Sequence, residues 1–212
     1  MESLRALNRR ELAGALEHLS VSDARLGRII QSVGACKIKK RQDPFQSLAE
    51  AIIYQQLAGS AADAIYNRFV KIYGSFPEPA QLLATHSAKL RAAGLSGRKI
   101  EYLKDLASHV SDGRLKLSLL ASMADDQVVE QLVQVKGIGP WTAEMFLIFC
   151  LGRPDVLPVG DLGLRRAMQK TYSLSELPLP AAMQNIAQPW KPYRSIATWY
   201  LWKSLEQFKG IG

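Results

Sequence analysis

Apolar side chains recur every three to four residues along nearly all of this 212-residue chain, and this spacing is typical of amphipathic helices. Clear examples are Leu12, Leu16 and Leu19; Leu48, Ile52 and Ile53; and Val128, Val129, Leu132 and Val133. The alternating Val, Ile and Thr runs that indicate strands are missing. The sequence therefore predicts an all-α fold, with helices expected among others at 45–58, 60–73, 96–110, 125–135, 140–151 and 162–172.

The charge balance indicates the kind of partner. Lys and Arg number 27 against 19 Asp and Glu, which gives a net charge of +8 and a pI near 9.6. Such an excess favours a polyanion, which at this point can be DNA, RNA or an anionic membrane surface. An apolar fraction of 48% is sufficient for a sizeable core, so the chain is not a disordered basic tail.

Cysteine and histidine usage limits the cofactors. The two cysteines, Cys36 and Cys150, cannot supply the four thiolates of an iron–sulfur cluster and argue against a disulfide framework. The three histidines, at 18, 86 and 109, are scattered without a second ligand at metal spacing. We expect no iron–sulfur cluster and no zinc or iron site.

The N-terminal residues MESLRALNRR place charges where a signal peptide needs its apolar stretch. The longest strongly apolar run, 145–151, is far shorter than the ~20 residues of a membrane span. We therefore expect an unexported, monomeric protein without membrane contact. Its expected location is the cytoplasm and nucleoid, or the nucleus in a eukaryote.

The segment Val-Lys-Gly-Ile-Gly-Pro-Trp-Thr-Ala at 135–143 lies between two helical patterns and needs a tight connection. Its glycines, Gly137 and Gly139, permit positive φ and close approach of another molecule, while Ile138 can fill the gap between the helices. Pro140 suits the first position of the second helix. Amides exposed at such a helix start can bind a phosphate oxygen without reading a base. An isolated Gly-x-Gly is more often a capping glycine in an ordinary helical hairpin.

Further positions extend this motif. The segment 132–143 resembles the helix-hairpin-helix of the HhH-GPD superfamily of DNA glycosylases, and Asp161 follows Gly139 by 22 residues, where that superfamily keeps an essential aspartate. Two more segments are similar to the 3-methyladenine DNA glycosylase (AlkA/Mag-like) branch: Phe45-x-x-Leu48-x-x-Ala51-Ile-x-x-Gln55-Gln56-Leu57, and 190–202. The resemblance covers about residues 40 to 207. It implies base excision repair of alkylation damage in double-stranded DNA.

The resemblance implies that Asp161 is the catalytic residue. An alkylated purine is already cationic, so the enzyme must mainly supply a carboxylate that stabilises the cationic sugar and directs a water molecule. Read without the family, Asp161 is simply the N-cap of the helix that follows it, and both readings are compatible. Bifunctional members place a Schiff-base lysine where this chain has Trp141. A monofunctional glycosylase, which leaves an abasic site, is expected.

The resemblance also implies a base pocket and a wedge. Trp141 and Trp202 would stack on a flipped cationic base. Core packing is the alternative role for such large aromatic residues. The expected pocket further contains Tyr54, Met145, Phe45 and Leu162; Met145 and Leu162 stand where a close relative carries tyrosines, which makes the pocket less aromatic. Leu57, or its neighbour Gln56, is expected to fill the hole left by the flipped nucleotide. Leu57 read alone is an ordinary core leucine.

The residues expected to contact phosphates lie in the hairpin or in the helix after Asp161. They are Gly137, Ile138, Gly139, Thr142, Lys136, Arg165 and Arg166. Arg165 and Arg166 would also help to keep Asp161 ionised. The resemblance implies that the carbonyls of Val133, Val135 and Ile138 can hold a structural Na⁺ or K⁺.

A two-lobed fold is expected from these motifs. Residues 1–44 and 152–212 would form one helical lobe, and residues 45–151 the middle lobe ending in the helix-hairpin-helix at 132–151, with Asp161 in a cleft between the lobes. About 40 residues precede the resemblance, so we do not expect the additional N-terminal β domain that some longer relatives possess. Two rival functions stay open: a DNA-binding module without chemistry, and a bifunctional lyase for oxidised bases.

Overall fold

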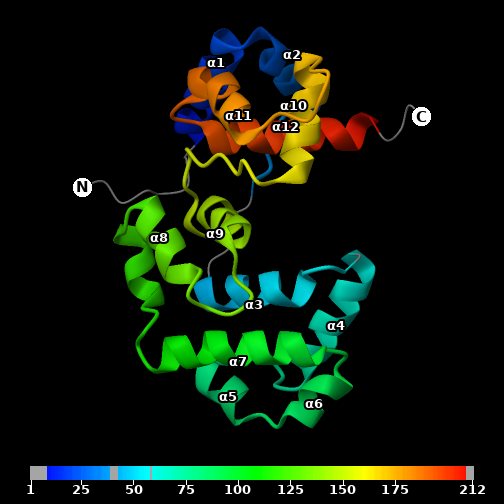
Figure 1. Ribbon diagram of the computed structural model, residues 1–212, viewed down its shortest axis with the longest axis vertical. Coiled ribbons are helices and arrows are strands. Elements are labelled where there is room, and N and C mark those ends of the chain that lie inside the picture. Colours follow the sequence, from blue (N-terminus) through cyan, green and yellow to red (C-terminus); the bar gives the residue numbers. More distant parts are fainter. Residues whose placement is uncertain (1–8, 39–42, 58, 209–212) are drawn as a thin grey trace. The chain divides into compact units, whose positions relative to one another are not determined.

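The computed structural model describes residues 9–38, 43–57 and 59–208, in which every regular element is a helix (Figure 1). The chain divides into two compact units: unit 1 comprises Met1–Lys40 with Leu147–Gly212, and unit 2 comprises Arg41–Phe146. No helix in the described part of the chain is long and apolar enough to cross a membrane. The predicted all-α class is therefore confirmed for the described residues.

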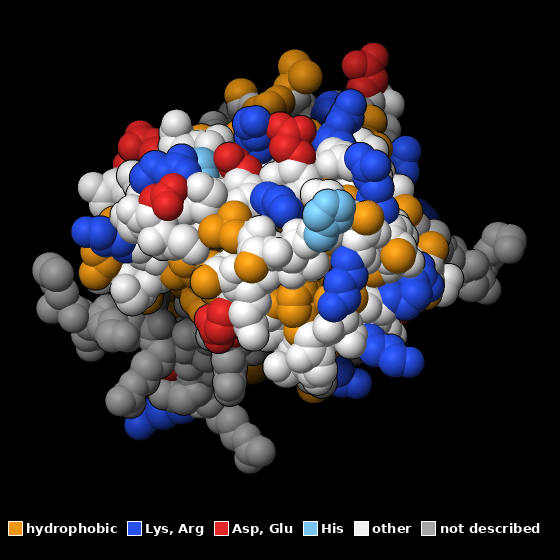
Figure 2. Space-filling model, turned by 90° about the horizontal axis from the view of Figure 1, so that it is seen from below, with side chains coloured by type: hydrophobic (Ala, Val, Ile, Leu, Met, Phe, Trp, Pro, Cys, Tyr) orange, Lys and Arg blue, Asp and Glu red, His pale blue; other side chains and the backbone are white. Residues whose placement is uncertain are grey.

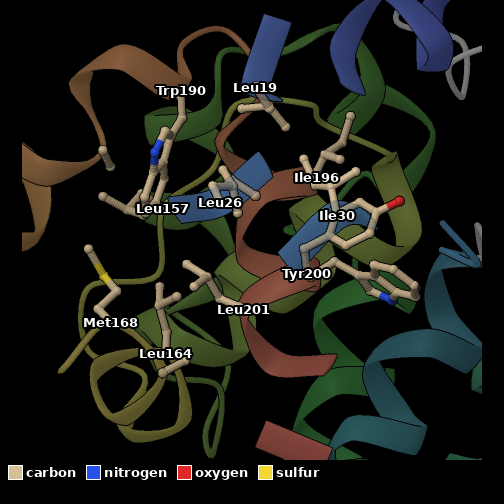
Figure 3. Close-up of a cluster of buried hydrophobic side chains, with 14 of the residues drawn as sticks. Leu19, Leu26, Ile30, Leu157, Leu164, Met168, Trp190, Ile196, Tyr200 and Leu201 are labelled. Carbon is tan, nitrogen blue, oxygen red and sulfur yellow. The ribbon is translucent and has the colours of Figure 1, made fainter. Parts of the chain in front are cut away.

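Unit 1 is built around its last helix. Its elements are α1 (Arg9–Ser22), α2 (Ala24–Val33), the π-helical turn η2 (Leu147–Leu151), α10 (Leu162–Tyr172), α11 (Pro180–Ile186), η3 (Gln188–Trp190) and α12 (Arg194–Phe208). Helix α12 packs against both α2 and α10, and α1 packs against α2. Figure 3 shows side chains from α1, α2, α10, η3 and α12 meeting in one apolar cluster; they include Leu19, Leu26, Leu164, Trp190 and Tyr200.

Unit 2 comprises α3 (Pro44–Tyr54), α4 (Gly59–Lys71), α5 (Pro79–Ala84), α6 (Ser87–Ala92), α7 (Gly97–Ser111), η1 (Leu117–Ser122), α8 (Asp125–Leu132) and α9 (Pro140–Phe146). Helix α7 packs against α3, α5 and α6, while α9 packs against α3 and α8. Figure 2 shows Lys and Arg side chains spread over the face of the molecule seen from below, with acidic side chains among them.

Four expected helices end earlier than the apolar spacing predicted, and two of them do so by only two or three residues, at Lys71 and Leu132 instead of 73 and 135. The helix expected at 45–58 ends at Tyr54, because Gln55 already leaves the helical backbone angles, with a ψ of 132°, and Gln56 then adopts a positive φ of 56°. The helix expected at 140–151 stays α-helical only to Phe146 and continues as the π-helical turn η2. These two larger differences are changes of backbone hydrogen bonding that leave the apolar spacing almost unaltered.

Asp23 ties three elements of unit 1 together. Its Oδ1 caps α2 by accepting the amides of Arg25 and Leu26 at 3.0 and 3.1 Å. Its Oδ2 accepts the hydroxyl of Tyr172 and, at 3.0 Å, the indole N–H of Trp190. Burial acts to raise the pKa of Asp23, but these hydrogen bonds outweigh burial and lower the pKa below its ordinary value.

The Asp23→Asn variant is expected to lower the free energy of unfolding by about 1–3 kcal/mol at pH 7, because the NH₂ group that replaces Oδ2 cannot accept a hydrogen bond from the Tyr172 hydroxyl or the Trp190 indole. A carboxylate whose pKa is depressed by folding stabilises the fold above its unfolded pKa, and this contribution is lost as the pH falls through the folded value. The difference in the free energy of unfolding between wild type and variant, measured by urea unfolding, should therefore be constant from pH 5 to 8. It should become smaller below about pH 4. A difference that persists undiminished at pH 3 would contradict this role.

Candidate functional site

Asp161 is fixed at the start of α10. It is the N-cap residue, and its Oδ1 accepts the amide of Leu164 at 2.5 Å. The same oxygen accepts the indole N–H of Trp202 at 2.8 Å, and Trp202 comes from α12, 41 residues further along the chain. The side chain is half-buried. Asp161 is thus both a helix cap and a carboxylate held in one position by two N–H donors.

Trp202 is itself held by a second aromatic ring. Its indole stacks on Phe149 of η2, with ring centroids 6.0 Å apart and an interplanar angle of 23°. Stacking together with the hydrogen bond to Asp161 leaves the indole little rotational freedom. The structure therefore brings two of the predicted site residues, Asp161 and Trp202, into direct contact.

Three more predicted residues lie on the first turns of α10. Leu162 is 47% exposed, which is high for a leucine, and it directly follows Asp161. Arg166 is exposed, whereas Arg165 donates from Nε to the carbonyl of Pro178 at 3.0 Å. Arg165 is thus partly engaged within unit 1, and Arg166 presents the more accessible cation.

In unit 2 the hairpin between α8 and α9 has the geometry expected of a close approach. Gly137 has a φ of +83°, Ile138 is buried, and α9 begins at Pro140. A Cβ on Gly137 would lie 2.1 Å from the ring of Tyr102, so both the backbone and the neighbour require glycine. Gly139 does not have a positive φ, in contrast to the freedom expected for both glycines.

Some polar groups of the hairpin form hydrogen bonds within the protein, and others have no acceptor there. The Lys136 amide donates to Asp105 at 2.8 Å, and the Lys136 ammonium pairs with Glu101 at 2.7 Å. Among the described residues, the amides of Gly137 and Gly139 donate to no protein acceptor. Thr142 is buried, so its side chain is not an outward-facing phosphate ligand in this structure. The two glycine amides are therefore the strongest candidates for an anion contact.

The loop after α3 is joined to this hairpin within unit 2. Gln55 donates from Nε2 to the carbonyl of Gly137 at 2.8 Å, and Lys99 of α7 donates to the carbonyl of Ile53 at 2.6 Å. Burial lowers the pKa of Lys99. Gln56 and Leu57 follow, and Leu57 leaves 38% of its surface exposed. An exposed leucine on a fixed loop is suited to the predicted wedge, and the alternative of a core leucine does not hold.

The remaining predicted pocket residues of unit 2 differ in accessibility. Trp141 is 47% exposed at the start of α9, so it is not a core residue, and Met145 is half-buried. Tyr54 is also exposed, and its hydroxyl donates to Asp63 at 2.6 Å. Phe45 is only 6% exposed and packs edge-on against Phe76 at 6.0 Å, which places it in the core of unit 2.

Comparison with known proteins gives the family. The model of the HhH-GPD superfamily base excision DNA repair protein matches residues 49–192. The chain belongs to this superfamily. The match spans the loop after α3, the hairpin and Asp161, which are the features described above.

Individual HhH-GPD relatives are similar over most of their length. The chain is 36% identical to DNA-3-methyladenine glycosylase 1 of Schizosaccharomyces pombe, with 88% of this chain and 85% of the relative covered. It is 33% identical to the putative DNA-3-methyladenine glycosylase YfjP of Bacillus subtilis, over 92% of this chain and 70% of the relative. The predicted membership of a DNA glycosylase superfamily is thereby confirmed.

Solved HhH-GPD structures have the same fold. The S. pombe 3-methyladenine DNA glycosylase Mag1 in complex with abasic DNA matches with a TM-score of 0.81 and 35% identity, covering 91% of this chain and 97% of that one. A DNA-3-methyladenine glycosidase from Bacillus halodurans matches with a TM-score of 0.83 and 39% identity, covering 92% and 91%. DNA is thus the partner that the superfamily fold indicates for this chain.

Two residues that organise the HhH-GPD hairpin were not found by sequence reasoning. Gln55 lies within the 45–57 motif, but the spacing of that motif does not distinguish Gln55 from Gln56. Tyr102 lies on an ordinary turn of α7, and only the structure places its ring against Gly137. Both contacts join segments far apart in the chain, so no local pattern could have indicated them.

Proposed function

We propose that this protein is a monofunctional DNA glycosylase that releases 3-methyladenine and related alkylated purines from double-stranded DNA and leaves an abasic site. The observation that carries the proposal is the Asp161 carboxylate, fixed by the α10 N-terminus and by the Trp202 indole N–H. The similarity to the S. pombe protein named DNA-3-methyladenine glycosylase 1 supports the substrate class.

Asp161 supplies the electrostatic part of the reaction. As the bond between the sugar and a cationic purine breaks, positive charge develops on the sugar ring, and a fixed carboxylate stabilises that charge. Asp161 then orients a water molecule, whose oxygen bonds to the sugar carbon while one of its protons passes to the Asp161 carboxylate and from there to solvent. The leaving purine departs as a neutral base, so no general acid is needed. Fixing by two N–H donors reduces the reorganisation that the carboxylate would otherwise undergo.

The exposed groups of unit 2 bind the DNA and the flipped base. Leu57 inserts where the flipped nucleotide has left the stack, and the Trp141 indole stacks on the cationic base. The amides of Gly137 and Gly139, with Arg166 on unit 1, contact phosphates. These contacts are independent of base sequence, so selection rests on the charge and the weakened stacking of the damaged base.

A covalent amine mechanism is not part of this proposal. The position at which bifunctional relatives carry a lysine holds Trp141. The nearby Lys136 pairs with Glu101, and the hydrogen bond and charge of that carboxylate raise the pKa of Lys136, which keeps the amine protonated and non-nucleophilic. The carbonyls of Val133, Val135 and Ile138 would be the ligands of a structural Na⁺ or K⁺ ion, because neutral carbonyl oxygens are chemically suited to such ions. The Val135 carbonyl already accepts the Ile138 amide at 3.1 Å but keeps a second lone pair.

The decisive experiment is incubation of the protein with methylated duplex DNA. We expect free 3-methyladenine in the supernatant by chromatography, alkali-labile abasic sites in the DNA, and no covalent adduct after borohydride reduction. Absence of base release would favour a DNA-binding module without chemistry, and a borohydride-trapped adduct would favour a lyase. Light scattering is expected to give a monomer of 23.5 kDa.

The Gln55→Glu variant tests the link between the loop after α3 and the hairpin. Its carboxylate would face the Gly137 carbonyl in place of a donor, so we expect about 3- to 10-fold weaker binding to abasic DNA in a fluorescence titration. Gln127→Glu is the matched control: it adds the same charge to unit 2, and its Oε1 can still accept the Ala124 amide. Equal affinities of the two variants would show that the link has no part in DNA binding.

A further inference from the structure

Gly163 occupies an unusual place for a glycine. It is the second residue of α10, directly after Leu162, and it does not have a positive φ. Alanine is more favourable than glycine at a helical position with ordinary backbone angles. The backbone of α10 therefore does not explain the residue, and the reason must lie in the space around it.

That space is filled by Asp161 and Trp202. A Cβ built on Gly163 would lie 3.1 Å from Oδ1 of Asp161, closer than ordinary van der Waals contact. It would also lie 3.5 and 3.6 Å from Cδ1 and Nε1 of the Trp202 indole. The Asp161 carboxylate and the Trp202 indole thus both pack against Gly163, at the place where another residue would carry its side chain.

The carboxylate has little room to yield. Oδ1, the oxygen nearest to the missing side chain, is the atom that accepts both the Leu164 amide at 2.5 Å and the Trp202 indole N–H at 2.8 Å. The indole is also stacked on Phe149. Moving Oδ1 away from a new methyl group must lengthen or bend at least one of these two hydrogen bonds.

We propose that Gly163 is a positioning residue: its missing side chain sets where the Asp161 carboxylate stands relative to the Trp202 indole. The proposal rests on the function proposed above, because a carboxylate displaced by a few tenths of an ångström matters most where charge develops in a transition state. Displacements of this kind near reacting atoms lower rates steeply while leaving binding almost unchanged.

The test compares Gly163→Ala with Gly14→Ala. Gly14 is a helical glycine of α1 with nothing within 4 Å of a built Cβ, so it controls for the gain in helix propensity. We expect Gly163→Ala to lower the single-turnover rate of base release about 10-fold or more. Affinity for abasic DNA should stay within about 2-fold, and the melting temperature should not fall. Gly14→Ala should match wild type in rate and affinity.

A double variant asks whether the loss is transmitted through the Trp202 contact. Trp202→Phe keeps a ring but removes the indole N–H donor to Asp161. If Gly163→Ala acts by disturbing the same hydrogen bond, the two losses in rate will be less than multiplicative when combined. Fully multiplicative losses, or a wild-type rate for Gly163→Ala, would overturn the proposal.

A spectroscopic measurement separates failure of this proposal from failure of the proposed function. The Nε1–H resonance of Trp202 in a ¹⁵N–¹H spectrum, assigned by its disappearance in Trp202→Phe, reports the hydrogen bond to Asp161 without any substrate. We expect it to shift in Gly163→Ala and not in Gly14→Ala. If wild type releases no base but the resonance shifts, the positioning contact stands and the glycosylase assignment fails. An unmoved resonance overturns the positioning role.

Discussion

The Asp161→Asn variant is expected to release alkylated base about 10²- to 10³-fold more slowly than wild type while remaining folded. Asparagine has nearly the same size as aspartate, and its Oδ1 can still accept the Leu164 amide and the Trp202 indole N–H. It is also an equally good helix cap. The substitution therefore removes the negative charge and retains the geometry, which separates catalysis from capping.

The measurement is single-turnover release of 3-methyladenine at saturating enzyme, accompanied by thermal melting and by a titration with abasic DNA. Melting temperature and affinity should be close to wild type. Asp112→Asn is the matched control, since it removes the same charge from an exposed pair with Arg114. Such exposed pairs contribute little stability. Base release by Asp161→Asn at the wild-type rate would leave Asp161 with capping as its only role.

The parts of the site that the sequence predicted are those determined locally. The turn at Gly137 depends on one glycine, one buried isoleucine and a proline within four residues, and the structure has each of them as expected. The N-cap position of Asp161 is likewise a local property of the residues around the start of α10. Local chemistry thus indicated where a helix begins and where the chain turns.

The contacts that give these residues a function are not local. Trp202 reaches Asp161 across 41 residues, and Gln55 reaches the Gly137 carbonyl across 82. The early end of α3 at Tyr54 involves Lys99, which donates to the Ile53 carbonyl from 46 residues away. Phe45 illustrates the same limit, because the motif that suggested a pocket residue does not reveal that Phe76 packs on its ring.

The Gly137→Ala variant is expected to have the largest effect on stability. A Cβ at this position would lie 2.1 to 2.6 Å from three ring atoms of Tyr102, and the φ of +83° is itself unfavourable for alanine. Overpacking of this kind and left-handed backbone strain together should lower the free energy of unfolding by about 2–4 kcal/mol. The hairpin amides should also lose their alignment, so affinity for abasic DNA should fall.

Urea unfolding of two further variants identifies the cause. Gly139→Ala meets nothing within 4 Å and has no positive φ, so its stability should stay within about 0.5 kcal/mol of wild type. Tyr102→Ala opens the space that the new methyl group needs but leaves the backbone angle unchanged. In the double variant, Gly137→Ala should therefore cost only the strain part, about 1–2 kcal/mol less than in the wild-type background. An equal cost in both backgrounds would mean that the backbone angle alone, and not the Tyr102 ring, excludes a side chain at Gly137.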